Sequence, residues 1–257
     1  MKNVKKIIFV IFAALTAFAL CALCGCGYVS GELWTDVKYA NESAYTVGGG
    51  EITGDVSEIV IDWVCDDITI EYYSGTAVKV EESADKEIEE KFQLRRLVQD
   101  GKLTVQFATN GRHDIRGLNK DLTVYIPTGV TLEKLDIDSV SGNITSTVSV
   151  KQAVVDNVSG SLTASKVTQS LTANTVSGSV MLYLSVTPAV SVNTVSGNVY
   201  LSVPETLGFS LTVATVSGKF NSSLEMAKNG DTYTRLGGGA NMTVDTVSGN
   251  INVNKIS

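Results

Sequence analysis

The residues able to do chemistry in this sequence are few. It holds a single histidine, His113, which stands beside Asp114 in a turn-like stretch, and cysteines only at positions 21, 24, 26 and 65. There is no pair of Cys-x-x-Cys motifs and no His-Glu-x-x-His motif, so a zinc site made only of protein ligands lacks its parts. A lone histidine next to an aspartate is usually a polar loop residue. We predict no catalytic residue, no metal site, no cofactor and therefore no enzyme.

A serine that recurs in a Val-Ser-Gly motif is the next candidate nucleophile. A nucleophilic serine needs a base within reach, and none of the copies has a histidine or lysine partner inside the repeat. Serine followed by glycine is a common turn sequence. We interpret these serines as turn formers: Ser141, Ser159, Ser177, Ser196, Ser217 and Ser248.

A carboxylate or amide recurs two residues before the valine of this motif. In stacked repeats these side chains would form a ladder, which could bind a hard cation or line a sugar-binding face. Ala214 interrupts the ladder, and the Gly- and Asp-rich nonapeptide of calcium-binding β-rolls is absent, so we assign no metal to it. The ladder remains the candidate binding surface: Asp138, Asp156, Asn174, Asn193 and Asp245.

The repeat itself predicts the fold. The valines recur at spacings of 18, 18, 19, 21 and 31 residues, which is typical of a solenoid. Counting from the valine, positions −5, −3 and +4 are apolar in every copy, whereas positions −4, −2 and −1 are mostly polar. This alternation predicts half-buried strands, with aliphatic columns inside and polar columns outside. The Ser-Gly pair marks a corner of each coil. The fold class is an all-β solenoid.

The predicted domain covers residues 51–257. Residues 59–70 form a degenerate first coil, residues 71–130 a region that caps the open end of the solenoid, and residues 135–257 the regular repeats. The wide spacing before the last repeat contains residues 225–240, a hairpin-like excursion that we regard as a potential binding loop.

The N-terminus reads as an export signal over residues 1–25. Lys2, Lys5 and Lys6 precede an apolar run from residue 7 to residue 23. The sequence Leu23-Cys24-Gly25-Cys26 resembles the lipobox of bacterial lipoproteins, which predicts cleavage before Cys26 and lipidation of its thiol. Two acyl chains would hold the protein stably on the membrane. An uncleaved transmembrane helix is the alternative.

Both alternatives place the domain outside the cytoplasm, on the outer face of the cytoplasmic membrane or on the cell surface. Residues 26–50 would then be a lipidated, flexible tether. Cys65 is the only cysteine of the mature domain, so no intramolecular disulfide can form. The net charge of −7 argues against a nucleic-acid partner, which would need a basic surface.

Residues 121–144, the recurring Thr-Val-Ser-Gly and residues 235–253 are similar to the bacterial toast-rack family of β-strand repeat proteins, which carries the name of adhesin. The resemblance covers residues 50–257. It implies a right-handed, single-stranded β-helix or β-roll outside the cell, frequently membrane-anchored and encoded with envelope-stress systems.

Two functions follow from this reading, both based on binding rather than chemistry. In the first, the protein is an adhesion module whose ladders hold wall glycan, host matrix or a neighbouring cell. In the second, it is an envelope-stress component that docks on a membrane signalling protein through its strand edges or residues 225–240.

Overall fold

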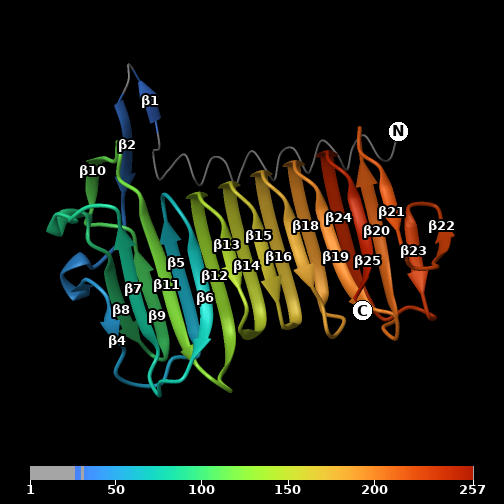
Figure 1. Ribbon diagram of the computed structural model, residues 1–257, viewed down its shortest axis with the longest axis horizontal. Helices are drawn as coiled ribbons and strands as arrows, with labels where there is room; N and C mark the ends of the chain where they lie inside the picture. The colour runs from blue at the N-terminus through green and yellow to red at the C-terminus, as the bar shows by residue number, and fades with distance from the viewer. Residues whose placement is uncertain (1–26, 30–31, 257) are drawn as a thin grey trace.

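The protein is an all-β rod built from two long sheets (Figure 1). The computed structural model describes residues 27–29 and 32–256, so the export signal and Cys26 lie outside the described residues. No helix in the described part is long and apolar enough to cross a membrane.

The first sheet has twelve strands, and its strands are mostly parallel. In spatial order they are β22 (Ala227–Asn229), β23 (Thr232–Arg235), β20 (Phe209–Thr215), β24 (Ala240–Ser248), β18 (Ala189–Ser196), β16 (Val167–Ser177), β14 (Ser149–Ser159), β12 (Thr131–Ser141), β5 (Glu58–Trp63), β9 (Lys102–Gln106), β8 (Arg95–Gln99) and β3 (Thr46–Val47).

The second sheet has ten strands, and each regular repeat supplies one of them after its corner. In spatial order they are β21 (Phe220–Ser222), β25 (Ile251–Ile256), β19 (Val199–Pro204), β17 (Val180–Tyr183), β15 (Leu162–Ser165), β13 (Ile144–Ser146), β6 (Ile68–Tyr73), β11 (Lys120–Pro127), β7 (Lys79–Ala84) and β4 (Gly50–Glu51).

The core lies between the inward faces of the two sheets. The predicted alternation is confirmed: Leu171, Ala173 and Val180 of one coil are all buried, and they pair in register with Val190, Val192 and Val199 of the next. Each coil buries only a few small aliphatic side chains, so its stability depends on stacking against its neighbours.

The predicted outward position of the −1 column is wrong. These residues are buried, because the alternation of the strand continues past position −3 and turns the −1 side chain into the core. The valine that follows is half-buried or exposed, as Val216 shows at 57% exposure. Three residues of the −1 column bond the nearby corner backbone: Asn157 Nδ2 donates to the carbonyl of Gly160 at 3.0 Å, and the hydroxyls of Ser139 and Thr175 donate to the carbonyls of Ser141 and Ser177 at 3.4 Å. The buried column is Ser139, Asn157, Thr175, Thr194 and Thr246.

The corner glycines are required by close stacking as well as by backbone conformation. A Cβ placed on Gly160 would lie 2.0 Å from the carbonyl oxygen of Gly142, and one on Gly142 would lie 1.8 Å from that of Asp66. Gly142 and Gly160 have φ of 113° and 114°, in the region that favours glycine. At Gly197 the contact is as close, 1.9 Å from Gly178, although its φ lies outside that region. Each coil therefore rests directly on the corner of the one before it.

We expect Gly160→Ala to lower the free energy of unfolding by about 3 kcal/mol, because the methyl group both collides with the Gly142 carbonyl and disfavours the positive φ. Gly230 is the matched control, with a φ of 60° and open space around its Cβ position. Gly230→Ala should cost only the conformational part, about 1 kcal/mol. Urea denaturation followed by circular dichroism measures both. Equal losses would show that stacking does not select the corner glycines.

The order of coils is interrupted at both ends of the rod. The coil of β24 and β25 is the last in sequence, yet it lies between β18–β19 and β20–β21. The coil of residues 59–70 is the first in sequence but not the outermost, because β9 and β11 lie outside β5 and β6. At one end the chain thus leaves a gap that β24 and β25 fill, and at the other it adds β9 and β11 outside the first coil before β12 continues on the inner side, so both terminal coils are held by long-range pairing.

Residues 225–240 form the predicted hairpin, but it is part of the sheet rather than a free loop. Its strands β22 and β23 pair antiparallel, and β23 pairs antiparallel with β20 at the end of the twelve-stranded sheet. At the other end, β3 and β8 close the same sheet, and β1 (Gly27–Val29), β2 (Glu32–Val37) and β10 (Gly111–Asp114) form a separate small sheet beside it (Figure 1).

Candidate binding surface

The predicted ladder residues lie side by side on the outward face of the twelve-stranded sheet. Asp138, Asp156, Asn174, Asn193 and Asp245 are direct lateral partners on β12, β14, β16, β18 and β24. Asp62 on β5 continues the row next to Asp138. We call these six residues the outer polar row.

Hydrogen bonds connect the middle of the outer polar row. Asn174 Nδ2 donates to Asp156 Oδ1 at 2.6 Å, and Asn193 Nδ2 donates to Asn174 Oδ1 at 2.8 Å. The direction is set by chemistry, since only the amide nitrogens can donate. The row is therefore an ordered strip of carboxylate and amide oxygens rather than a set of independent side chains.

Sequence reasoning did not place Asp62 in the ladder, although the signal was present. Asp62 stands two residues before Val64, which occupies the valine position of the degenerate coil. Beyond Asp62 the same lateral position is taken by Gln106 on β9 and then by Arg95 on β8, both of them buried. No pattern in the sequence announced these two, because their strands lie outside the regular repeat.

Two carboxylates of the outer polar row, Asp62 and Asp138, have raised pKa values. Burial raises the pKa of Asp62 to about 6. The pKa of Asp138 is also raised to about 6, first by partial desolvation and then by the neighbouring charges of Asp156, Asp62 and Asp136, while Lys134 acts in the opposite direction. The side chain of Asp138 keeps contact with solvent, so the carboxylate repulsion is screened rather than fully felt.

We expect Asp138→Asn to be more stable than the natural protein at pH 8 and equally stable below pH 4. The folded pKa of about 6 lies above the value of about 3.9 for an unfolded aspartate, so the folded state binds the proton more tightly and stability falls as pH rises between those values. An asparagine carries no such charge at any pH. Melting temperatures of both proteins from pH 3.5 to pH 8 test this. A difference in melting temperature between the two proteins that stays constant across that pH range would contradict it.

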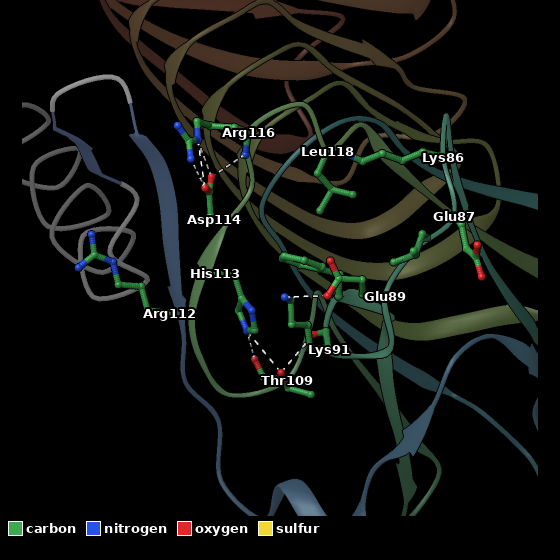
Figure 2. A pocket seen from close by; sticks show the side chains of 12 residues that line it. Lys86, Glu87, Glu89, Lys91, Thr109, Arg112, His113, Asp114, Arg116 and Leu118 are labelled. Atoms are coloured by element: carbon green, nitrogen blue, oxygen red, sulfur yellow. Dashed lines mark hydrogen bonds and ion pairs between the residues drawn. The ribbon is translucent and has the colours of Figure 1, made fainter.

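His113 has a structural role. Its Nε2 lies 2.8 Å from the carbonyl oxygen of Thr109, an acceptor, so this nitrogen carries the proton. Its ring packs at 5.3 Å from that of Phe92, and the residue is 6% exposed. The residue faces a hollow of about 860 Å³ at the cap end, whose rim holds the ion pairs Arg116–Asp114 and Lys91–Glu89 (Figure 2). The opposite charges within each pair neutralise each other. The hydroxyl of Thr109 lies 3.4 Å from His113 Nε2, but it donates to the carbonyl of Lys91 at 3.1 Å, and Nε2 is engaged by the Thr109 carbonyl, so this contact is structural.

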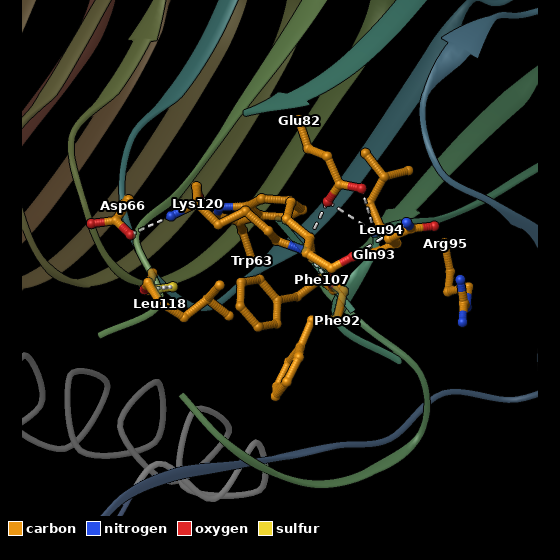
Figure 3. Close-up of polar contacts among 12 residues, drawn as sticks. Trp63, Asp66, Glu82, Phe92, Gln93, Leu94, Arg95, Phe107, Leu118 and Lys120 are labelled. Carbon is orange, nitrogen blue, oxygen red and sulfur yellow. Dashed lines mark hydrogen bonds and ion pairs between the residues drawn. The ribbon is translucent and has the colours of Figure 1, made fainter. Parts of the chain in front are cut away.

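Lys120 is the unexpected residue of the cap end, because it is a fully buried lysine (Figure 3). Its Nζ donates to the carbonyl oxygens of Phe92 and Phe107, each at 2.5 Å, and lies 2.9 Å from Glu82 Oε2. It also sits over the rings of Trp63 and Phe107, at 4.6 and 4.1 Å from their centroids. Burial lowers its pKa to about 8 despite the opposing effect of Glu82.

The remaining sequence candidates have ordinary surroundings. Ser141 Oγ donates to the carbonyl of Val64 at 3.2 Å, and Ser217 Oγ donates to that of Val247 at 3.2 Å, which fits serines that join neighbouring coils at the corner. Cys65 is half-buried, and its Sγ lies 3.5 Å from the carbonyl oxygen of Leu118. No group of three or more His, Cys, Asp or Glu side chains in the described part is arranged to hold a metal ion.

The repeat geometry agrees with a known family. A profile of the Toastrack DUF4097 family matches residues 56–187 and, a second time, residues 148–254. The chain belongs to the Toastrack family. The overlap of the two matches shows that the Toastrack pattern runs through the whole rod, from the degenerate coil at residues 59–70 to the last strand.

Two solved structures are similar to this chain at low sequence identity. A putative cell adhesion protein from Clostridium sporogenes is 10% identical with a TM-score of 0.54, over 82% of this chain and all of that one. A putative adhesin from Bacteroides fragilis is 11% identical with a TM-score of 0.43, over 82% of this chain and 97% of that one. No curated protein matches the sequence. The first likeness supports the fold alone.

Proposed function

We propose that this Toastrack protein is a cell-envelope lipoprotein that works by binding rather than by chemistry, as an adhesion module. In the proposal, Cys26 carries the lipid, residues 1–25 are the cleaved export signal, and the coils wind in a right-handed sense. Within the predicted tether of residues 26–50, β2 and β3 pair with β10 and β8 of the domain. The partners are polymers or proteins outside the cell, among them wall glycan and matrix.

The observation that carries the proposal is the outer polar row. It spans six adjacent strands, and its middle members are fixed by hydrogen bonds, so it presents oxygen and amide groups at the regular spacing of about 4.8 Å between strands. A rigid, repetitive strip of this kind suits a partner that is itself repetitive, because each rung can meet an equivalent group. The structurally similar protein from Clostridium sporogenes is named a putative cell adhesion protein, which agrees with such a role.

The test uses bacterial cells that produce the full chain, with adherence to purified cell walls and to extracellular matrix as the readout. We expect Asn174→Ala with Asn193→Ala to lower adherence at least tenfold. Thr172→Ala with Ser191→Ala is the matched control, because these residues lie on the same two strands and the same face, in the neighbouring row. If cells that produce the natural protein adhere to every surface no better than cells that lack it, the proposal is overturned.

The lipid anchor is tested separately. Cys26→Ser should leave the protein in its uncleaved form or release it from the membrane, and it should abolish incorporation of labelled fatty acid. Cys24→Ser is the matched control, because Cys24 lies two residues before the proposed cleavage point and should not be lipidated. Unchanged fatty-acid incorporation in Cys26→Ser would contradict the anchor.

A further inference from the structure

The outward face of the ten-stranded sheet carries two tyrosines on adjacent strands. Tyr200 on β19 is the lateral partner of Met181 on β17, and Tyr183 on β17 is the lateral partner of Ser202 on β19. Tyr183 and Met181 lie two residues apart on one strand, so their side chains point to the same face as that of Tyr200. We call Met181, Tyr183 and Tyr200 the tyrosine platform.

Both tyrosines of the platform have solvent-accessible surface. Tyr183 is 47% exposed, among the few large hydrophobic residues of the described chain with such exposure, and Tyr200 is half-buried. Neither hydroxyl makes a hydrogen bond to another described residue. Diagonal neighbours on adjacent strands have Cβ atoms about 7–8 Å apart, close enough for the two rings to contact one ligand.

The other tyrosines of this sheet are engaged in the fold. Tyr72 donates its hydroxyl to the carbonyl of Val130 at 2.8 Å and accepts from the backbone N–H of Ser149 at 2.9 Å. Tyr73 hydrogen-bonds to the carbonyl of Ala77, and its ring packs at 5.6 Å from that of Tyr125. By contrast, neither Tyr183 nor Tyr200 makes a ring–ring contact or a hydroxyl hydrogen bond with another described residue.

The outward positions in register with the platform are uncharged, and lysines appear only one residue further along, at Lys166 after Ser165 and Lys255 after Asn254. The outward positions in register with it hold only hydroxyl and amide side chains, on a protein whose net charge is −7. Hydroxyl and amide groups can both donate and accept hydrogen bonds, as the hydroxyls of a sugar require. These positions are Thr145, Thr163, Ser165, Ser202, Asn252 and Asn254.

We propose that the tyrosine platform binds an uncharged polysaccharide, with sugar rings stacked on Tyr183 and Tyr200 and hydroxyls bonded by the flanking Thr, Ser and Asn side chains. The negative face of an aromatic ring attracts the polarised C–H groups on one side of a sugar ring, and the ring supplies apolar area at low entropic cost. An ionic ligand is disfavoured because none of the outward positions in register with the two tyrosines carries a charge. The platform lies on the other sheet from the outer polar row, and this inference rests on the proposed function, since it gives the binding module a ligand class and a site.

The experiment applies the detergent-solubilised full chain to an array of neutral and acidic glycans. We expect binding to neutral glycans only. Tyr183→Ser with Tyr200→Ser should lower that binding at least tenfold, whereas Tyr183→Phe with Tyr200→Phe should retain it within about threefold, because phenylalanine keeps the stacking face. Thr172→Ala with Ser191→Ala, on the other sheet and outside the outer polar row, is the second control and should leave glycan binding unchanged. All variants are exposed substitutions, so their melting temperatures should stay close to that of the natural protein.

The outcomes separate this inference from the proposed function. Binding to acidic glycans alone, or neutral binding that survives the serine variant, would overturn the platform while leaving adhesion through the outer polar row in place. No binding to any glycan, with adherence of the cells intact, would also overturn the platform alone. Cells that fail to adhere to any surface would overturn the proposed function and, unless neutral glycans bind on the array, the platform with it.

Discussion

Val192→Asp should unfold the domain. Val192 is fully buried, with Ala173 and Val244 as its lateral neighbours in the core column. A carboxylate placed there has no cation or donor to compensate it, and such substitutions belong to the exceptional class that costs more than about 4 kcal/mol. Domains have total stabilities of only about 5–15 kcal/mol, so most of the folded population is lost. Far-ultraviolet circular dichroism and urea denaturation at pH 7 measure the loss.

Asn193→Asp is the matched control, one residue along the same strand and on the opposite face. It removes the hydrogen bond from Asn193 Nδ2 to Asn174 Oδ1 and places a carboxylate beside Asp245. We expect a loss of about 1 kcal/mol at pH 7, since one partly exposed hydrogen bond is broken. The loss should shrink at pH 4, where a protonated aspartate can donate again. If both substitutions unfolded the domain equally, the assignment of Val192 to the inward face and Asn193 to the outward face would be wrong.

The regular part of the rod follows from the sequence because its signals are local. Side chains along a strand alternate with a period of two, so those of Val192 and Asn193 point to opposite faces of the sheet. The same rule, applied consistently, would have turned Thr194 inward, but a polar residue was taken as an exposed one. It would also have paired Tyr183 with Tyr200, since both lie at odd offsets from their motif valines, on the side opposite the buried +4 residue.

The ends of the rod do not follow from the sequence because their neighbours are distant along the chain. Nothing in the 31-residue spacing before Val247 reveals that β24 and β25 return to fill a gap between earlier coils. Lys120 stands between Asn119 and Asp121, a setting typical of a surface loop. Lys120 is buried by contacts with residues 82, 92 and 107, which lie on three other segments of the chain. A local sequence pattern around Lys120 therefore could not predict its burial.

Lys120→Met should cost about 3–5 kcal/mol, the effect of breaking a buried ion pair by removing one partner. Methionine matches the apolar stem of lysine, so it tests the charge rather than the volume. Without the ammonium group, Glu82 keeps only the backbone N–H of Leu94, at 2.9 and 3.0 Å from its two oxygens, and the carbonyls of Phe92 and Phe107 lose their common donor. The free energy of unfolding in urea at pH 7 measures the cost.

Lys79→Met provides the matched control on the adjacent strand. Lys79 pairs with Glu81, but both side chains are substantially solvent-exposed, so the loss should stay below about 1 kcal/mol. A second readout concerns pH: the folded pKa of Lys120, about 8, lies below that of an unfolded lysine, so the unfolded state binds the proton more tightly and stability rises between pH 8 and pH 10. This rise should be absent from Lys120→Met and present in Lys79→Met. A small loss in Lys120→Met, with an unchanged pH profile, would mean that the cap end is held by Trp63 and Phe107 packing alone.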